Sequence, residues 1–264
     1  MVSVYNTNGE KIEEIELPEV FKTKYRPDVI RKDFRVYMSK LRQPYGTDVF
    51  AGKRTSAHYH GKRRYRYTMM NREMSRLPRI HGGGYLQWRA RFAPHAVKGR
   101  RAHPPKSTKK WELKINKKEE MLAIKSAIAA SANLKLVHAH GYKTVKEVPI
   151  IVSDDFENIQ KTKELYNALN KIGLEKEVER IKEKKVRAGK GKMRGRKYKK
   201  KKGILIVVSQ DCNLLKAGKN IADVATVDDL NIALLAPGGD AGRLIVFTKS
   251  SLKKLAALGD KNEQ

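Results

Sequence analysis

The chain has 264 residues, and its 58 lysines and arginines against 28 aspartates and glutamates give a formal net charge of +30. An excess of this size goes beyond the needs of solubility and indicates a polyanionic partner. The single cysteine, Cys212, excludes an intrachain disulfide framework and a cysteine-based zinc cluster, and we interpret it as a half-buried residue after a strand. No apolar run approaches the roughly 20 residues of a membrane span, and the acidic N-terminus is unlike a signal peptide, so we expect a cytoplasmic protein without a membrane partner.

The N-terminal part predicts a hairpin followed by a helix. Residues 2–5 and 11–17 flank an Asn-Thr-Asn-Gly turn, which is typical of a β-hairpin. A helix is predicted after Pro27, a residue that suits the first helical position, and should end before Pro44. Its expected buried face consists of the apolar residues that recur at helical spacing: Ile30, Phe34, Tyr37, Met38 and Leu41.

Strand and helix patterns alternate in the second half of the chain. A capping box of Asn116 and Glu119 opens a predicted helix, whose apolar face would contain Met121, Ile124, Ile128 and Ala132. The apolar run 148–152 predicts a strand, and residues 154–172 predict a helix that Gly173 closes. A further helix is expected over residues 174–181.

Three later runs are short, rich in β-branched residues and nearly continuous, as expected for strands buried on both faces: 204–208, 222–226 and 244–247. Residues 227–235 and 250–258 predict helices. This alternation predicts an α/β fold class, in the form of a three-layer α/β/α domain with a mostly parallel sheet.

Residues 42–110, called the basic insertion below, differ from the rest in composition. They contain 18 lysines and arginines but only two acidic residues, Asp48 and Glu73, together with five of the seven histidines. The positive charges of this segment repel one another, and its two carboxylates cannot neutralise them. We therefore expect the segment to become ordered when it binds a phosphate backbone. It is also far longer than a usual connection, which indicates a functional or a disordered loop, with a reach of at most about 110 Å.

The basic insertion alternates aromatic residues with arginines, a mixture that suits RNA because exposed rings stack on unpaired bases. The alternative is that some of these rings form a local cluster under the loop. The rings are Tyr59, Tyr65, Tyr67, Tyr85, Trp88 and Phe92. Glycines at 52, 61, 82, 83, 84 and 99 would allow tight turns and close approach of the backbone to phosphates.

A second basic tract spans residues 184–202 and holds 12 basic residues with no acidic one. A solvated linker or a localisation signal could have this composition. Because the tract lies between a predicted helix and a predicted buried strand, we favour a second clamp on an RNA backbone. The expected organisation is therefore a globular domain of residues 1–41 and 111–264, the inserted extended loop 42–110, and the tract 184–202 within the globular domain.

Catalytic and metal sites are not expected. His58-x-His60 and His138-x-His140 lack a third ligand at a familiar spacing, so no metal is predicted. The glycine-rich stretches match neither a phosphate-binding loop nor a dinucleotide site, which leaves no cofactor and no small-molecule substrate. The carboxylate pairs Asp154/Asp155 and Asp228/Asp229 follow strands and precede helices, where capping is the expected role.

Six longer motifs together carry a resemblance to a known family. They are "AGKRTSA" at 51–57, "AVKGRRAHPPK" at 96–106, "AIKSAIAASA" at 123–132, "EVPIIVSDDFE" at 147–157, "KVRAGKGKMRGRKYKK" at 185–200 and "LAPGGDAGRLIVFTKSSL" at 235–252. With these motifs the chain resembles, nearly end to end, the universal large-subunit ribosomal protein number four family in its archaeal and eukaryotic form, and lies nearer the archaeal members.

The resemblance implies a non-enzymatic structural protein of the large ribosomal subunit in the cytoplasm. The α/β domain would lie on the outer surface of the subunit, and the loop would enter the large-subunit rRNA, stabilise its fold during assembly and line the constriction of the polypeptide exit tunnel with its tip. Implied partners are large-subunit rRNA, neighbouring large-subunit ribosomal proteins and the nascent polypeptide. The alternatives are an RNA-processing or other nucleic-acid-binding protein without a ribosomal role, or a chromatin binder. Charge placed in one long loop suits irregular RNA better than a DNA groove.

Basic residues of the matching motifs and of the loop between them are the expected rRNA contacts. In the basic insertion these are Lys53, Arg54, His58, His60, Lys62, Arg63, Arg64, Arg66, Arg72, Arg76, Arg79, His81, Arg89, Arg91, Lys98, Arg100, Arg101 and Lys106. In the second tract they are Lys190, Lys192, Arg194, Arg196 and Lys197. Residues 58–76 are longer and more basic than the short glycine-rich tip of the family. We expect residues 61–72 to form the tip, with Arg63, Arg64, Tyr65, Arg66, Tyr67, Met69 and Met70 facing the tunnel.

Overall fold

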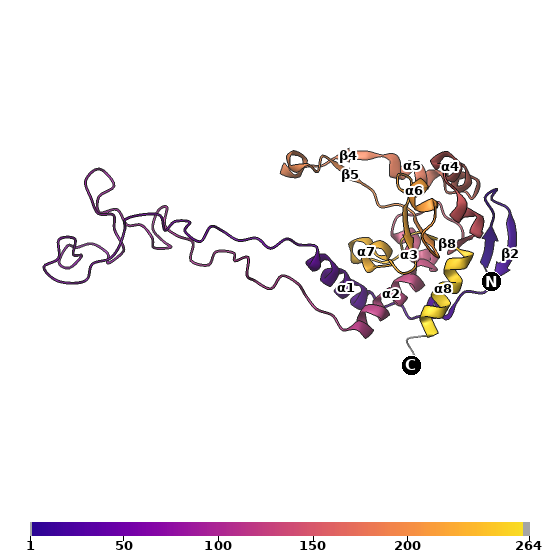
Figure 1. Ribbon diagram of the computed structural model, residues 1–264, viewed down its shortest axis with the longest axis horizontal. Coiled ribbons are helices and arrows are strands. Elements are labelled where there is room, and N and C mark those ends of the chain that lie inside the picture. The colour runs from indigo at the N-terminus through magenta and orange to yellow at the C-terminus, as the bar shows by residue number, and fades with distance from the viewer. Residues whose placement is uncertain (1, 261–264) are drawn as a thin grey trace. The chain divides into compact units, whose positions relative to one another are not determined.

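The computed structural model describes residues 2–260 and divides into two compact units. The first unit comprises Met1–Leu41 and Glu112–Gln264, and the second comprises Arg42–Trp111. The chain leaves the first unit after α1 (Pro27–Lys40) and re-enters it before α2 (Lys117–Ser131), as Figure 1 shows. The second unit is therefore an insertion between two consecutive helices.

The first unit is built on a six-stranded sheet with the order β2-β1-β3-β8-β6-β7. Only β1 and β2 pair in the antiparallel sense, as a hairpin, and every other neighbouring pair is parallel. The strands are β1 (Val2–Tyr5), β2 (Lys11–Ile15), β3 (Ile150–Val152), β6 (Leu205–Val208), β7 (Asp223–Thr226) and β8 (Ile245–Thr248). The predicted mostly parallel sheet is confirmed.

Helices cover both faces of this sheet, because successive strand residues point to opposite sides. In β6, Leu205 and Val207 join one hydrophobic cluster, while Ile206 and Val208 join the other. The first cluster contains residues of α1, α2, α7 (Ile232–Leu235) and α8 (Lys249–Asp260). The second contains residues of α3 (Leu134–Ala139), α4 (Thr162–Lys171), α5 (Glu175–Lys182) and α6 (Leu214–Gly218). The predicted three-layer α/β/α arrangement is confirmed.

The buried faces of two helices differ from those predicted. In α1, Ile30 is buried, but Met38 and Leu41 are 44% and 62% exposed, and Asp33 is buried in their place. In α2, Met121 of the predicted apolar face is 39% exposed. The predicted capping box does not form either: the side chain of Asn116 makes no capping hydrogen bond, and the Glu119 carboxylate pairs with Lys32 of α1. Packing between the helices therefore overrides the local sequence signal.

Three polar contacts break the helix predicted over residues 154–172. The carboxylate of Glu157 accepts hydrogen bonds from the hydroxyls of Ser209, Thr248 and Ser250, which hold a short 3₁₀ turn, Asp154–Asn158, at the ends of β6 and β8. The remaining helix, α4, begins only at Thr162. The neighbouring Asp154 accepts the backbone N–H of Ser250 at the start of α8, so it caps a helix distant in sequence rather than its own.

The helix predicted over residues 227–235 shortens to α7. Its first turn is capped by Asn231, whose side chain accepts the backbone N–H of Leu234. Asp228 pairs with Lys254 of α8, and Asp229 accepts the hydroxyl of Thr226, so neither carboxylate caps a helix as predicted. Tertiary partners thus delay the start of the helix by five residues relative to the prediction of position 227.

The first unit also buries one charged side chain of the motif at 235–252. Arg243 is fully buried and donates hydrogen bonds to the carbonyl oxygens of Gly203 and Leu234, at 2.8 and 2.7 Å. Its guanidinium also pairs with Asp223 at the start of β7. Partial burial opposes ionisation of Asp223, but the hydrogen bonds and charges of Arg243 and Lys202 outweigh it and lower the pKa of this carboxyl. Arg243 therefore joins the segment before β6 to the start of β7 and to α7.

Among the helices of residues 2–260, none combines the length and apolar character that crossing a bilayer requires.

Candidate nucleic-acid interface

Two segments at the ends of the second unit run side by side, and we call them the stem (residues 42–53 and 99–111). The backbone N–H of Thr47 donates to the carbonyl oxygen of Pro105 at 3.1 Å. Glycines permit the close approach farther along, since a Cβ on Gly52 would lie 2.6 Å from the Cα of Arg100. Gly52 also has a φ of +73°, which disfavours any residue with a side chain.

Residues 54–98, called the head below, contain turns and bends instead of helices or longer strands. Isolated antiparallel bridges join His58 to Arg79 and Arg79 to Ala90. A few small or flexible apolar side chains are buried in this unit, among them Met69, which is 2% exposed. With so little apolar burial, the head has few of the contacts that stabilise an ordinary domain.

The charge of the second unit is almost uncompensated. Among the residues that the structure describes, Arg54 is the one cation of the basic insertion that pairs with a carboxylate, that of Asp48. The backbone N–H of Phe50 and then the Arg54 guanidinium lower the pKa of Asp48, so this carboxyl is ionised at neutral pH. Most of the remaining lysines and arginines are exposed and stay available for an external anion.

Most of the predicted rRNA contacts lie on the surface. The exposed ones are Lys53, Arg54, His58, Lys62, Arg63, Arg64, Arg66, Arg72, Arg76, Arg89, Lys98, Arg101, Lys106, Lys190, Lys192, Arg194, Arg196 and Lys197. The half-buried ones are His60, Arg79, His81, Arg91 and Arg100. Exposed guanidinium and ammonium groups can reach phosphate oxygens without rearrangement of the fold.

Two of the half-buried arginines bind the backbone of the head itself. The Arg79 guanidinium donates to the carbonyl oxygens of Trp88 and Ser75, at 2.8 and 3.0 Å. Arg91 donates to the carbonyl oxygen of Val97 at 2.6 Å. A guanidinium whose N–H groups are occupied in this way is a weaker candidate for a phosphate contact, and it organises the loop instead.

The aromatic side chains of the head divide between the two interpretations left open by the sequence. Tyr65 and Tyr85 are 55% and 82% exposed. His60 stacks on Tyr65 at 5.7 Å and the Arg89 guanidinium lies over Tyr85 at 5.4 Å, which leaves the other face of each ring for a nucleobase. Tyr67, in contrast, stacks on His81 with ring centroids 4.2 Å apart, and Trp88 lies under the guanidinium of Arg72 at 4.3 Å. The head therefore has both exposed aromatic rings and a local aromatic cluster.

The structure separates the residues predicted for the tip by exposure. Arg63, Arg64, Tyr65 and Arg66 are exposed, whereas Tyr67 and Met70 are half-buried. Met69 is buried, and its backbone N–H donates to the carbonyl oxygen of His60 at 3.2 Å. Its side chain therefore packs inside the head instead of facing outward.

A groove in the stem was not anticipated from the sequence. It has a volume of ≈ 680 Å³, and the rings of Tyr45 and Trp111 line it with centroids 4.6 Å apart. The Arg42 guanidinium lies over the Trp111 ring at 4.9 Å, and the Lys109 ammonium lies over it at 5.4 Å. Rings and cations in one groove suit a nucleobase with its phosphate. The signal in the sequence was an aromatic residue at each end of the insertion.

The second basic tract forms a hairpin, which the sequence analysis had not predicted. Strands β4 (Lys184–Val186) and β5 (Tyr198–Lys200) pair in the antiparallel sense, and a 3₁₀ turn, Lys190–Arg194, lies between them. Gly195 ends this turn with a φ of +75°. At the base of the hairpin Lys201 pairs with Glu183. Beyond it the half-buried Arg187 donates to the carbonyl oxygen of Arg196, and the other basic side chains are exposed.

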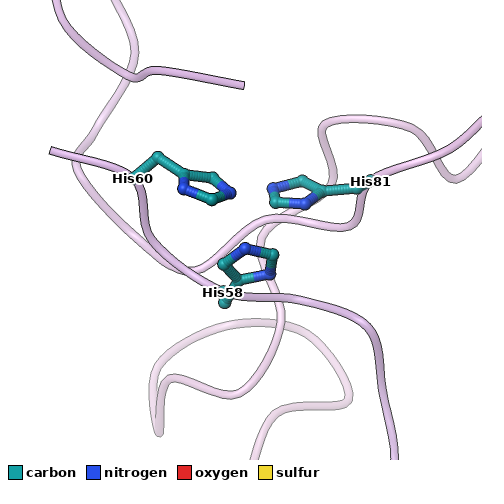
Figure 2. Close-up of side chains that lie close together, drawn as sticks. All are labelled: His58, His60 and His81. Atoms are coloured by element: carbon teal, nitrogen blue, oxygen red, sulfur yellow. The ribbon is translucent and has the colours of Figure 1, made fainter. Parts of the chain in front are cut away.

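Three histidines of the head also lie together, and we call His58, His60 and His81 the histidine cluster (Figure 2). Burial, and then the proximity of His58 and His60, lowers the pKa of His81. No third ligand for His58 and His60 was recognised in the sequence, because His81 follows 21 positions after His60 and no local spacing connects them.

Comparisons with known proteins agree with the resemblance seen in the motifs. Residues 15–258 match the model of the ribosomal protein L4/L1 family. The large ribosomal subunit protein uL4 of Methanocaldococcus jannaschii is 50% identical over 96% of this chain and 96% of its own length. The proteins of the same name from Nanoarchaeum equitans and Archaeoglobus fulgidus are 48% and 46% identical, each over 96% of this chain and over 97% and 96% of their own lengths.

Proposed function

This chain belongs to the ribosomal protein L4/L1 family, and we propose that it is a structural constituent of the large ribosomal subunit in the cytoplasm that binds large-subunit rRNA. The uncompensated positive charge of the second unit carries this proposal, because one ion pair with a carboxylate is its only internal neutralisation among the described residues. A polyanion with a closely spaced phosphate backbone supplies the missing counter-charge.

The stem and the head contribute different kinds of contact. Exposed arginines of the head, such as Arg64 and Arg66, neutralise phosphates, and Tyr65 and Tyr85 stack on unpaired bases. The hairpin of β4 and β5 forms a second phosphate clamp. Because this binding orders both protein and RNA, the chain stabilises the rRNA fold during assembly and catalyses no reaction.

The tip of the head is proposed to be residues 61–72, which line the constriction of the polypeptide exit tunnel and contact the nascent polypeptide. Exposure favours Arg63, Arg64, Tyr65 and Arg66 for this role over the buried Met69. A map of the ribosome that contains this chain tests the assignment. The four exposed side chains should border the tunnel, and a stretch 61–72 buried wholly in rRNA would contradict it. The same map would identify the neighbouring ribosomal proteins.

The deciding experiment compares affinity for large-subunit rRNA with affinity for duplex DNA of equal charge. One variant replaces residues 47–105 by a short Gly-Ser linker, which can close the gap because the N–H of Thr47 and the carbonyl of Pro105 are hydrogen bonded across the stem. We expect this variant to keep a folded first unit, as monitored by circular dichroism, and to lose its preference for rRNA. If it discriminates between the polymers as the intact chain does, the insertion is not the recognition element.

A matched pair of full-length variants separates local placement from total charge. One variant changes the exposed Lys62, Arg63, Arg64 and Arg66 to Gln, and the control changes the exposed Lys163, Lys176, Lys216 and Lys219 of the first unit to Gln. Both lose four charges, but only the first should weaken rRNA binding substantially. Equal losses would indicate nonspecific attraction by net charge.

A further inference from the structure

The histidine cluster brings together side chains from two separate stretches of the head (Figure 2). The bridge between His58 and Arg79 aligns these stretches, with N···O distances of 3.3 and 3.2 Å. The ring centroid of His58 lies 4.0 Å from that of His60 and 4.1 Å from that of His81. One ring nitrogen of each histidine lies within 4.8 Å of the others. Three nitrogen donors therefore converge on one point.

Hydrogen bonding leaves lone pairs free in this cluster. His58 Nδ1 lies 3.2 Å from the carbonyl oxygen of Ser56, and a carbonyl accepts only from a protonated nitrogen, so Nε2 keeps its lone pair. His81 Nε2 is buried and finds no hydrogen-bond partner among residues 2–260. Burial of a polar atom without a partner is unfavourable, and coordination of this nitrogen to a metal ion would remove the cost.

Neighbouring groups pack against His60 and His81, whereas His58 is exposed. The ring of Tyr67 stacks almost parallel on His81, at an interplanar angle of 7°. His60 is anchored through its carbonyl oxygen, which accepts the backbone N–H of the buried Met69. These contacts hold the ring of His81 and the backbone of His60 near their positions.

From this arrangement we infer that the histidine cluster binds one divalent transition metal ion, and that its preferred occupant is Zn²⁺. Neutral imidazole suits zinc and its neighbours, whereas Mg²⁺ and Ca²⁺ require oxygen ligands that the cluster does not contain. Zinc binds imidazole nitrogen at about 2.0 to 2.1 Å, which places tetrahedral ligands about 3.3 Å apart. Side-chain rotations that close the three nitrogens by on the order of 1 Å therefore complete the site.

The role of this site is structural. The cluster contains no carboxylate that could act as a general base, and the metal would join His58 and His60 to His81, closing residues 61–80 into a loop. This loop includes the stretch 61–72. The fourth coordination position is open to water or to a phosphate oxygen. Because three neutral ligands leave the charge of the ion uncompensated in a basic segment, bound polyanions should strengthen metal binding.

Titration of the untagged, metal-free full-length chain with Co²⁺ and Zn²⁺ tests the inference. We expect one Co²⁺ per chain with the visible absorption bands of a four-coordinate ion, and displacement of Co²⁺ by Zn²⁺. His81→Ala should weaken binding at least about 100-fold, whereas His95→Ala, which removes an exposed histidine of the same head, should leave it unchanged. Absence of these bands in the wild-type chain, or equal binding by the two variants, overturns the proposal.

Trypsin digestion supplies a readout that requires no variant. Exposed arginines from Arg63 to Arg76 offer cleavage sites inside the loop that the metal would close, and the hairpin tract 184–202 offers sites outside it. Zn²⁺ should slow cleavage within residues 61–80 several-fold while cleavage of the hairpin proceeds at its original rate. Equal cleavage of the loop with and without Zn²⁺ excludes the structural cross-link.

Discussion

Asp33 is a carboxylate in an unfavourable position on α1. It is 4% exposed. Burial, reinforced by the nearby Glu120 of α2, raises its pKa to about 6, although Lys40 acts in the opposite direction. Because this pKa exceeds the ordinary value of 3.8, the folded chain binds a proton more tightly than the unfolded chain does. The contribution of Asp33 to stability is therefore greatest below pH 4 and declines as pH rises through about 6.

We expect Asp33→Asn to raise the free energy of unfolding at pH 7.5. The increase should be at most about 3 kcal/mol, because the pKa shift is about two units and each unit corresponds to about 1.4 kcal/mol. Urea unfolding of the wild-type and variant chains between pH 4.5 and 7.5 measures the difference, which should shrink toward the acidic end. Asp211→Asn removes an exposed carboxylate and serves as the control. Parallel curves for the wild type and Asp33→Asn would show that this carboxyl is not destabilising.

The turn that joins the head to the stem depends on a glycine. A Cβ on Gly99 would lie 1.9 Å from the carbonyl oxygen of Ala93, a separation that no side chain can occupy. A Cβ on Gly83, in the same insertion, would meet no atom within 4 Å. The two glycines therefore provide a matched pair for testing how tightly the second unit is packed.

Gly99→Ala should open the junction of stem and head, while Gly83→Ala should be tolerated. Overpacking costs about 1 to 3 kcal/mol, which would raise the open population, and with it the tryptic cleavage rate, roughly 5- to 150-fold. Limited proteolysis of both variants measures this effect. If both variants are cleaved at the wild-type rate, the packing around Gly99 is looser than the structure indicates.

The hairpin of β4 and β5 can be tested without disturbing the core, because four basic side chains of its turn are exposed. Changing Lys190, Lys192, Arg194 and Arg196 to Gln should lower rRNA affinity and reduce the log–log slope of affinity against salt by about 3. The free energy of unfolding should change by less than about 0.5 kcal/mol. Filter binding at several salt concentrations gives the slope, and an unchanged slope would assign the tract to a linker.

Sequence patterns predicted most elements of the first unit, because hydrophobic periodicity reflects burial directly. The strands β1, β3, β6, β7 and β8 all lie within one or two residues of their predicted positions. The errors occurred where distant polar groups decide the outcome, as when Glu157 meets hydroxyls of two other strands and interrupts a helix. Such partners have no local signature in the sequence.

The candidate interface was less completely predictable. Composition alone identified the basic insertion, because an excess of basic over acidic residues can be counted without knowing the fold. It could not distinguish the exposed Arg66 from Arg79, whose two terminal nitrogens donate to backbone carbonyls. The composition also could not predict that His81 lies next to His58, because that proximity follows from a β-bridge within an irregular loop.

At the scale of the whole molecule, the distribution of charge over two separate elements predicts an extended contact with RNA. Ten phosphate contacts imply a log–log slope of roughly −7 to −9 for affinity against salt concentration. The variant without residues 47–105 should retain only the hairpin contacts and show a slope of about −3. Titrations across a range of potassium chloride concentrations measure both slopes. A slope of about −2 for the intact chain would contradict the extended contact.

The position of β8 has a consequence for biosynthesis. This strand lies between β3 and β6, yet it follows every other strand of the sheet in the sequence. During translation β2-β1-β3 and β6-β7 are therefore made as two separate halves, and the edges of β3 and β6 lack a partner until residue 248 has been added. Unpaired apolar edges promote aggregation. The nascent chain of this protein consequently exposes these two apolar edges to wrong pairing until its central strand is available.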